Sequence, residues 1–368
     1  MIKQLSLSLL VLSTAAMASA ENVSLKIETK LAIKRALEYL AGQQNEAGFW
    51  STPDHPGLSG LVVKAYATSP IEGEAGRESP VAEKGAEFLL TKVQPDGGIY
   101  SKGEGLANYN TSISLMALHA MGGHDDVVLK ARNFVTTGQM LTYVPGTPEY
   151  KYFGGIGYGS HPEHSDVMNT TFAIQSLIET RELAERSNDA ADLDWEAAVQ
   201  FLERCQNLDE PEDSPNRGGF IYTPGSSKAG EITLPNGETA LRSYGSVSYS
   251  GLMSYTYADL SQDDPRVLGV LEWLQEHFTL TENPGMDQQG LFYYYMTMGI
   301  GLDAAGITTL DTQTQGPVNW REALTVRLLE IQKEDGSWQN ANGRWMEQDP
   351  NLVTAYTLLA LNKIYPDL

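Results

Sequence analysis

Apolar residues recur at spacings of three, four and seven along much of this chain, which indicates helices rather than strands. The clearest cases are two sets of three, Leu115, Leu118 and Met121, and Leu352, Tyr356 and Leu359. Six stretches rich in small and apolar residues are predicted to be helical: 58–66, 111–121, 170–180, 246–260, 292–305 and 352–364. A more amphipathic, charged helical stretch precedes each of them, and strand signals are weak throughout. The pattern therefore predicts six helical hairpins and an all-α fold.

A short phrase joins the two helices of each hairpin: a glutamine, then a glycine turn that closes on an aromatic residue. It is complete at 44–50 and 332–338, occurs in part at 94–100, at Gln139 and at 206–220, and has Phe278 in place of glutamine in the fifth unit. A unit of this size cannot bury its apolar face alone and must stack on its neighbours. We therefore predict an (α/α)6 toroid around a central cavity, with residues 21–368 as one domain. Insertions at 140–153 and 223–242 are expected to be loops, either at a functional mouth or as surface decoration.

The first twenty residues follow the pattern of a secretory signal peptide. Lys3 gives the positive start, residues 5–12 form an apolar core, and Ala18-Ser19-Ala20 is a small-residue cleavage site. A short membrane anchor is the alternative, but the apolar stretch is well below the roughly 20 residues that a bilayer span needs. We expect residues 1–20 to be removed, the protein to be secreted or periplasmic, and no integral membrane segment to remain.

Charge and cysteine content narrow the choice of partners. The formal net charge of −22 disfavours nucleic acid and anionic membrane surfaces as partners. Cys205 is the only cysteine, so no intramolecular disulfide can form. We expect a monomer with neither a metal nor a cofactor.

The glutamine and aromatic phrases resemble the QW motif of squalene cyclases and the related repeat of protein prenyltransferase β subunits. The closer resemblance is to secreted bacterial prenyltransferase/squalene-oxidase repeat proteins, and six stretches carry it: Gly218–Gly225, Tyr244–Ser246, Asp263–Arg266, Glu282–Met286, Gly290–Tyr295 and Arg344–Ala355. The resemblance covers the mature chain and implies an α/α toroid of terpene-cyclase type. A fold of this kind does not by itself fix an activity.

The chemistry that the resemblance implies is matched only in part. Class II cyclases carry Asp-x-Asp-Asp-Thr, and the nearest stretch here is Asp166-Val167-Met168-Asn169-Thr170, with Met168 at the position of the proton donor. Asp166 and Asn169 are therefore the catalytic candidates, with helix capping by Asp166 as the alternative. Prenyltransferases hold zinc through Asp, Cys and His, but Cys205 sits in an outer-helix position that predicts packing, so we predict no metal site.

We predict that the ligand binds near the starts of the inner helices, where tyrosines and loop residues gather. The candidate ligand-binding residues are Asn108, Tyr158, His161, Tyr244, Tyr249, Tyr294, Trp345 and Asp349. The leading hypothesis is an exported, squalene-cyclase-like protein that binds an apolar or amphipathic molecule such as an isoprenoid, with or without modifying it. The alternatives are a carbohydrate-active lyase or hydrolase acting on extracellular glycans, and a non-catalytic interaction scaffold.

Overall fold

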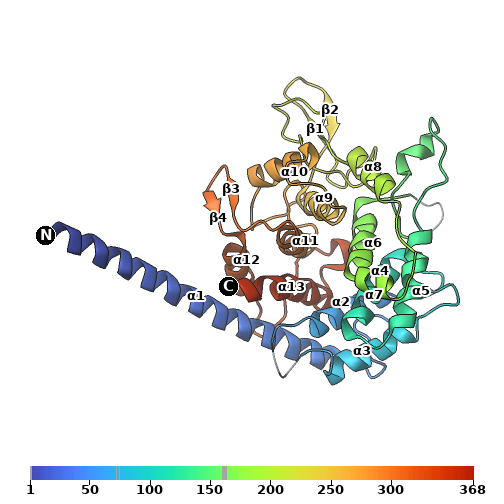
Figure 1. The fold of residues 1–368 in the computed structure, drawn as a ribbon, viewed down its shortest axis with the longest axis horizontal. Coiled ribbons are helices and arrows are strands. Elements are labelled where there is room, and N and C mark those ends of the chain that lie inside the picture. Colours follow the sequence, from blue (N-terminus) through green and yellow to red (C-terminus); the bar gives the residue numbers. More distant parts are fainter. Residues whose placement is uncertain (1, 72, 74, 160–163) are drawn as a thin grey trace.

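The computed structural model describes residues 2–71, 73, 75–159 and 164–368, with the backbone alone for residues 2–22. Helices dominate and pair into six hairpins, as the hydrophobic pattern predicts (Figure 1). The outer helices are α1 (Ile2–Gln43), α3 (Pro80–Leu90), α5 (Asp125–Thr137), α8 (Trp195–Cys205), α10 (Pro265–Glu276) and α12 (Trp320–Glu330). The inner helices are α2 (Pro56–Ala67), α4 (Ala107–Met121), α6 (Val167–Glu179), α9 (Gly245–Tyr257), α11 (Leu291–Ala304) and α13 (Pro350–Ile364). The all-α toroid is thus confirmed.

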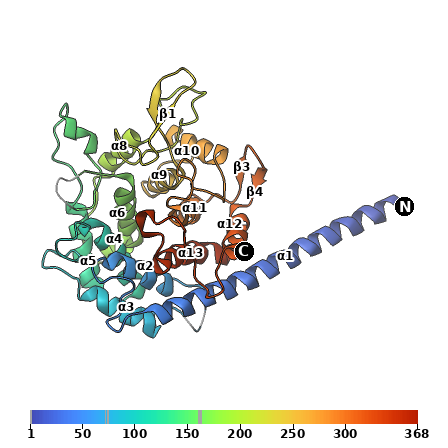
Figure 2. The same ribbon diagram turned by 180° about the vertical axis from the view of Figure 1, so that it is seen from behind.

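The inner helices form a closed ring in chain order. Each one contacts the next, from α2 to α13, and α13 contacts α2. The outer helices lie around this ring, and the view from behind shows the same two layers (Figure 2). Residues on the inner helices are almost all buried, which explains why these segments read as apolar around their whole circumference.

The glutamines of the repeated phrase tie each turn to the next outer helix. In four units the glutamine Nε2 donates one hydrogen bond to a glycine carbonyl of its own turn and a second to a carbonyl of the next outer helix or of the residue that caps it. The pairs of acceptors are Gly48 and Val81 for Gln44, Gly154 and Asp194 for Gln139, Gly218 and Arg266 for Gln206, and Gly336 and Ala32 for Gln332. The last pair, both at 2.9 Å, joins the sixth turn to α1 and so closes the outer layer.

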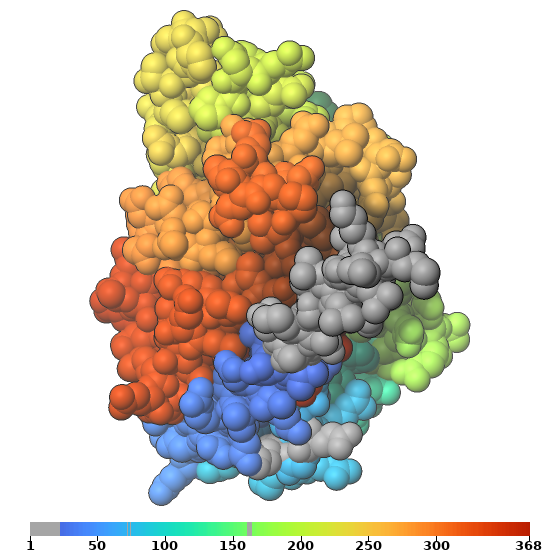
Figure 3. All heavy atoms as spheres, turned by 90° about the vertical axis from the view of Figure 1, so that its left-hand side faces the viewer, coloured from blue at the N-terminus to red at the C-terminus, as the bar shows by residue number. Residues whose placement is uncertain are grey.

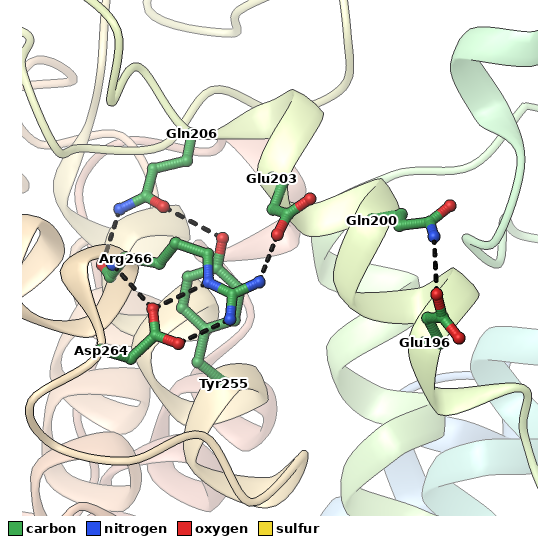
Figure 4. Close-up of polar contacts among 7 residues, drawn as sticks. All are labelled: Glu196, Gln200, Glu203, Gln206, Tyr255, Asp264 and Arg266. Carbon is green, nitrogen blue, oxygen red and sulfur yellow. Dashed lines mark hydrogen bonds and ion pairs between the residues drawn. The ribbon is translucent and has the colours of Figure 1, made fainter.

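Figure 4 shows the turn of the fourth unit, which carries Gln206. The Gln206 side chain also accepts a hydrogen bond from the Tyr255 hydroxyl at 3.0 Å, so an inner helix is linked to the same group (Figure 4). The neighbouring Arg266 pairs with Asp264 at 2.6 Å and also with Glu203 of α8. One glutamine therefore connects two outer helices and one inner helix.

The glycine and tryptophan of the phrase are required by close packing. Gly48 has φ +94°, and a Cβ there would lie 2.3 Å from the Lys84 carbonyl oxygen of the next outer helix. Trp50 is fully buried and its Nε1 donates to the Leu40 carbonyl at 2.7 Å. Trp338 repeats this contact with the Leu328 carbonyl at 2.8 Å.

The fifth unit keeps the geometry with different residues. It has no glutamine at the turn, and two hydroxyls of α11 reach the outer layer instead: Tyr294 donates to the Thr279 carbonyl and Tyr295 to the Leu280 carbonyl. These two carbonyls, in the segment just after α10, are thus satisfied by tyrosine, because an unpaired buried carbonyl would be costly.

Short elements occupy the connections between the helices of the toroid. The insertion at 223–242 contains an antiparallel hairpin of β1 (Glu231–Thr233) and β2 (Thr239–Leu241), and a second hairpin joins β3 (Leu310–Thr312) to β4 (Gly316–Val318). Figure 3 shows the residues around the first hairpin, in yellow, projecting from one end of the molecule. The remaining short helices are η1 (Pro148–Tyr152), α7 (Arg181–Arg186), η2 (Arg344–Met346) and η3 (Tyr365–Asp367). The weak strand signals of the sequence had not predicted these hairpins.

Candidate functional site

The inner helices all begin at one end of the ring, which we call the mouth. The first N–H groups of a helix have no partner within the helix, so other groups must accept from them. Asp166 caps α6 by accepting from the Asn169 N–H at 2.9 Å, and Asp349 caps α13 in the same way. Glu347 caps α11 from outside the helix, because it accepts from the Tyr293 N–H at 2.8 Å and also from the Phe292 N–H. Carboxylates at the mouth thus serve the helix termini first.

A narrow pocket of about 30 Å³ opens between the starts of α6, α9 and α11 and the segment before α13. Its lining residues are Met168, Tyr244, Ser246, Gly290, Tyr293, Trp345, Glu347 and Tyr356. We call it the mouth pocket. A volume of this size holds about two water molecules. Its walls are mainly aromatic, which suits apolar groups and the flat faces of rings.

The centre of the ring below the mouth pocket is filled by aromatic side chains. Tyr109 packs edge-on against Phe172 with ring centroids 5.5 Å apart, Phe172 lies 6.2 Å from Tyr293, and Tyr293 lies 5.7 Å from Tyr356. The central cavity that the fold predicts is therefore narrow in this structure. The mouth pocket lies above this filled centre.

Trp345 covers the mouth pocket and is held in an unusual conformation. Its φ is +55° and that of Met346 is +65°, so two successive residues that are not glycine adopt the left-handed region. Strain of this kind persists only where the surroundings enforce it, and it is common at ligand-binding segments. The Arg344 guanidinium stacks on the Trp345 ring at 4.3 Å, and a Cβ on Gly290 would lie 3.1 Å from that ring. The side chain is 39% exposed, so it forms part of the rim.

Asp166 is the most perturbed carboxyl group of the predicted site. It is fully buried, and its second oxygen accepts from Asn169 Nδ2 at 2.7 Å. Burial raises the pKa of Asp166 from 3.8 to about 6, although hydrogen bonds from Asn169 and Tyr222 act in the opposite direction. None of the groups that chiefly shift this pKa is another carboxylate, so Asp166 has no acidic partner to strengthen it.

The structure brings only some of the predicted residues to the mouth pocket. Tyr244 and Trp345 line it, with Asp166, Asn169 and Tyr158 close behind Tyr244. Asn108 is buried and donates to the Gly157 carbonyl at 3.1 Å, so it anchors the loop that carries Tyr158. Asp349 is a helix cap, as described above.

Two predicted ligand-binding residues, Tyr249 and Tyr294, lie away from the mouth pocket. Tyr249 and Tyr294 are fully buried against each other with ring centroids 5.5 Å apart, and Tyr294 points to the outer layer. Neither lines the mouth pocket, because the helical rotation between residues turns Tyr293 to the mouth and Tyr294 away from it. His161 lies outside the described residues.

Several residues of the pocket wall were not among the predicted site residues, chiefly Ser246, Tyr293, Glu347 and Tyr356. Tyr293 stands in a run of three tyrosines in which any one could have faced the ring centre. Glu347 lies in a stretch that carries the family resemblance, but nothing in the sequence distinguishes a buried cap from an exposed acid. No group of three or more His, Cys, Asp or Glu side chains in the described part of the chain is placed to hold a metal ion. Among the same residues, no helix is both long and apolar enough to cross a bilayer.

Known proteins share the fold of this chain, but none of the comparisons assigns it to a family. No protein-family model matches the chain, and no curated protein matches it. The fold is similar to that of type II terpene cyclase MstE from Scytonema, at 14% identity and a TM-score of 0.56, over 93% of this chain and 99% of the cyclase. A variant of that cyclase is known in complex with geranylgeranyl dihydroxybenzoate as substrate, and it matches with a TM-score of 0.57 at 14% identity, over 94% of this chain and 99% of that one.

Glycosidases share the same architecture. A GH76 alpha-mannanase from Bacteroides thetaiotaomicron is similar at 10% identity and a TM-score of 0.53, over 91% of this chain and 95% of the mannanase. A glycosidase solved in complex with glucose matches at 11% identity with a TM-score of 0.50, over 93% of this chain and 98% of that one. Similarity at this level of identity establishes the fold alone. The chain thus has the α/α toroid fold found in both terpene cyclases and glycosidases.

Proposed function

We propose that this protein binds an apolar or amphipathic small molecule of isoprenoid type at the mouth pocket. The observation that carries the proposal is the wall of Tyr244, Tyr293, Tyr356 and Trp345, which offers aromatic faces at the point where the inner helices begin. Aromatic walls with few free polar groups favour ligands that lose little hydration on binding. The similarity of the fold to a terpene cyclase is consistent with a ligand of this class.

The ligand enters by displacing the Trp345 side chain. A pocket of about 30 Å³ accepts only the end of such a molecule while Trp345 stays in place. Trp345 is the partly exposed wall, and its backbone is already strained, so moving it releases strain as well as contacts. We therefore assign the rim segment Arg344–Met346 as the cover of the site.

We assign binding rather than class II cyclisation to this site. Protonation of an alkene needs a strong acid, and the pKa of Asp166 is raised to about 6 by burial, with no paired carboxylate. Both oxygens of Asp166 also accept hydrogen bonds from Asn169, one from the backbone N–H and the other from the side-chain amide. A role for Asp166 in moving a proton to a bound ligand would be of the general acid type.

Mass spectrometry of the purified protein tests the binding proposal. Protein purified without detergent is extracted with organic solvent, and native spectra are recorded with added geranylgeraniol. We expect a one-to-one complex for the wild type and at least a tenfold loss of affinity for Met168→Trp, which fills the pocket. Val326→Trp on the exposed face of α12 is the matched control and should bind as the wild type does. Equal binding by both variants, or none by the wild type, would contradict the proposal.

A second candidate is the cleavage of extracellular glycans. A carboxyl group with a pKa of about 6 is suited to general acid catalysis near neutral pH, and the exposed ring of Trp345 could stack on a sugar at the rim. Against it, the other buried acid of the mouth, Glu347, already accepts from two backbone N–H groups and from Asn340. Release of reducing ends or of unsaturated products from a panel of glycans, lost in Asp166→Asn, would favour this second function.

We also propose that the chain is exported as a monomer after cleavage behind Ala20. The support is the sequence pattern of residues 1–20 and the lack of any described helix that could span a bilayer. Amino-terminal sequencing of the protein recovered outside the cytoplasm should give Glu21 as the first residue. Light scattering should give the mass of one chain.

A further inference from the structure

A second cavity lies at the opposite end of the ring, where the inner helices end. Its volume is about 220 Å³, and it lies between the last turns of α2, α6, α9, α11 and α13. The lining residues are Lys64, Thr68, Gln175, Glu179, Tyr257, Ile300, Leu359, Asn362 and Lys363. We call this the far-end cavity. It is larger than the mouth pocket and its wall is more polar.

An ion pair with unused hydrogen-bonding capacity stands in this wall. Lys64 Nζ donates to Glu179 Oε1 at 2.7 Å and contacts Met116 Sδ at 3.3 Å, which leaves one of its three protons without a hydrogen-bond partner among the described residues. Gln175 Nε2 donates to the same Glu179 oxygen at 2.8 Å. The second carboxylate oxygen of Glu179 therefore remains available as an acceptor.

Asn362 adds a buried acceptor that has no partner. Its Nδ2 donates to the Ala65 carbonyl at 2.8 Å and to Thr68 Oγ1 at 3.2 Å, but its Oδ1 makes no hydrogen bond. The side chain is only 8% exposed. A buried acceptor left unpaired costs roughly 1–3 kcal/mol, and a donor supplied by a ligand in the cavity would recover that cost.

The charges around the cavity oppose a strongly charged ligand of either sign. Glu179 is neutralised by Lys64, and Lys363 at the rim adds one positive charge. The ends of five inner helices contribute roughly half a negative charge each. An anion would meet the helix ends and a cation would meet the two lysines, whereas a neutral polar molecule meets neither penalty.

We propose that the far-end cavity is a second binding site, for a neutral polyhydroxylated molecule of monosaccharide size. A hydroxyl group both donates and accepts, which matches a wall that offers the Lys64 ammonium as donor and Glu179 and Asn362 as acceptors. Ile300, Leu359 and the Tyr257 side chain give the apolar surface on which the carbon face of such a ring packs. The volume is below the roughly 300–1,000 Å³ of sites for drug-sized ligands, which limits the ligand to a single small ring.

Ligand-observed NMR with the full-length protein tests this site. The probes are D-glucose, D-mannose and myo-inositol, each at millimolar concentration, with sodium acetate and tetramethylammonium chloride as charged probes. We expect saturation transfer from the protein to at least one of the neutral probes and not to the charged ones. Ile300→Trp, which fills the cavity, and Asn362→Leu, which removes the unpaired acceptor, should each weaken binding about tenfold, equivalent to roughly 1.4 kcal/mol.

Two further variants keep the result decisive. Met168→Trp blocks the mouth pocket and should leave binding of the neutral probe unchanged, so that failure at one site is distinguished from failure at the other. Lys363→Ala, at the exposed rim, should fold normally and weaken binding about threefold even where a core variant does not fold. The proposal is overturned by binding of acetate or tetramethylammonium alone, by silence with all neutral probes, or by a loss of binding confined to Met168→Trp.

Discussion

The two ends of the ring present the opposite ends of the same six helices. At the mouth the helices begin, and the groups around them are acceptors: Asp166, Glu347 and Asp349 all take hydrogen bonds from backbone N–H groups. At the far end the helices finish, and two lysines, Lys64 and Lys363, stand beside them. The positive ends of helix dipoles favour anions and the negative ends favour cations, so each end carries the charge that its helices stabilise.

The two ends therefore differ in the groups that remain free to bind a ligand. The mouth carboxylates are committed to helix caps, which leaves aromatic faces as the main free surface of that pocket. The far end leaves a carboxylate oxygen, an ammonium proton and the Asn362 oxygen free of partners in the described structure. Capping therefore makes the mouth suitable for apolar groups and the far end suitable for polar ones.

The largest expected effect comes from removing the carboxylate that caps α11. Glu347→Leu should leave the N–H groups of Phe292 and Tyr293 and the amide of Asn340 unpaired in a buried site. At roughly 1–3 kcal/mol for each unpaired group, partly relieved by relaxation, we expect a loss of about 3 to 5 kcal/mol in the free energy of unfolding by urea. Glu347→Gln keeps an acceptor and should lose less than half as much. If both variants lose the same amount, capping is not the role of this side chain.

Asp166 should make stability depend on pH. Its folded pKa of about 6 lies above the ordinary 3.8, so its contribution is fully present below pH 4 and is lost as the pH rises through 6. Asp166→Asn retains a good helix cap and removes the titration. Relative to this variant, the wild type should lose about 2 to 3 kcal/mol between pH 4 and pH 7.5 in urea unfolding. A constant difference across that range would mean that the carboxyl group is solvated.

The far-end ion pair should show coupling in a double-mutant cycle. Glu179→Leu leaves the Lys64 ammonium buried without its partner, and we expect a loss of about 2 kcal/mol, limited because the Glu179 side chain is 27% exposed. Lys64→Leu combined with Glu179→Leu should recover most of that loss, since two apolar side chains replace the pair. Additive losses in the double variant would show that the two groups are independent.

The sequence predicted the outer layer well because its signal is local. Gln206 bonds to its own turn and to the next outer helix, and Gly48 leaves no room for a Cβ, so each unit needs the same residue types at the same spacing. The fifth unit lacks the glutamine, and Tyr294 and Tyr295 of the inner layer bond instead to the Thr279 and Leu280 carbonyls just after its outer helix. A sequence pattern detects a repeated residue type such as glutamine, whereas the hydrogen bonds that link the two layers can come from other residue types such as tyrosine.

The mouth could not be predicted to the same degree because it depends on helix rotation. Tyr293, Tyr294 and Tyr295 point about 100° apart, and only the first lines the pocket. A one-residue choice thus decides between a site residue and a packing residue. Asp166 was found because it follows a known motif position, whereas Glu347 reaches α11 from another segment and carries no local signal.

The smallest expected effect on stability comes from Tyr244→Phe at the mouth. The Tyr244 hydroxyl is buried and makes no hydrogen bond, so its removal should change the free energy of unfolding by less than about 0.5 kcal/mol or should stabilise the fold. Tyr255→Phe is the matched control on α9, because that hydroxyl donates to Gln206, and it should cost about 1 kcal/mol in the free energy of unfolding.

The Tyr244 variant should also affect ligand binding. A ligand with a polar group, such as geranylgeraniol, can bond to the unpaired Tyr244 hydroxyl, so Tyr244→Phe should weaken its binding by about tenfold. Native mass spectrometry and urea unfolding measure the two effects separately. If Tyr244→Phe is less stable than Tyr255→Phe and binds the ligand as the wild type does, Tyr244 serves the packing of the ring rather than its binding site.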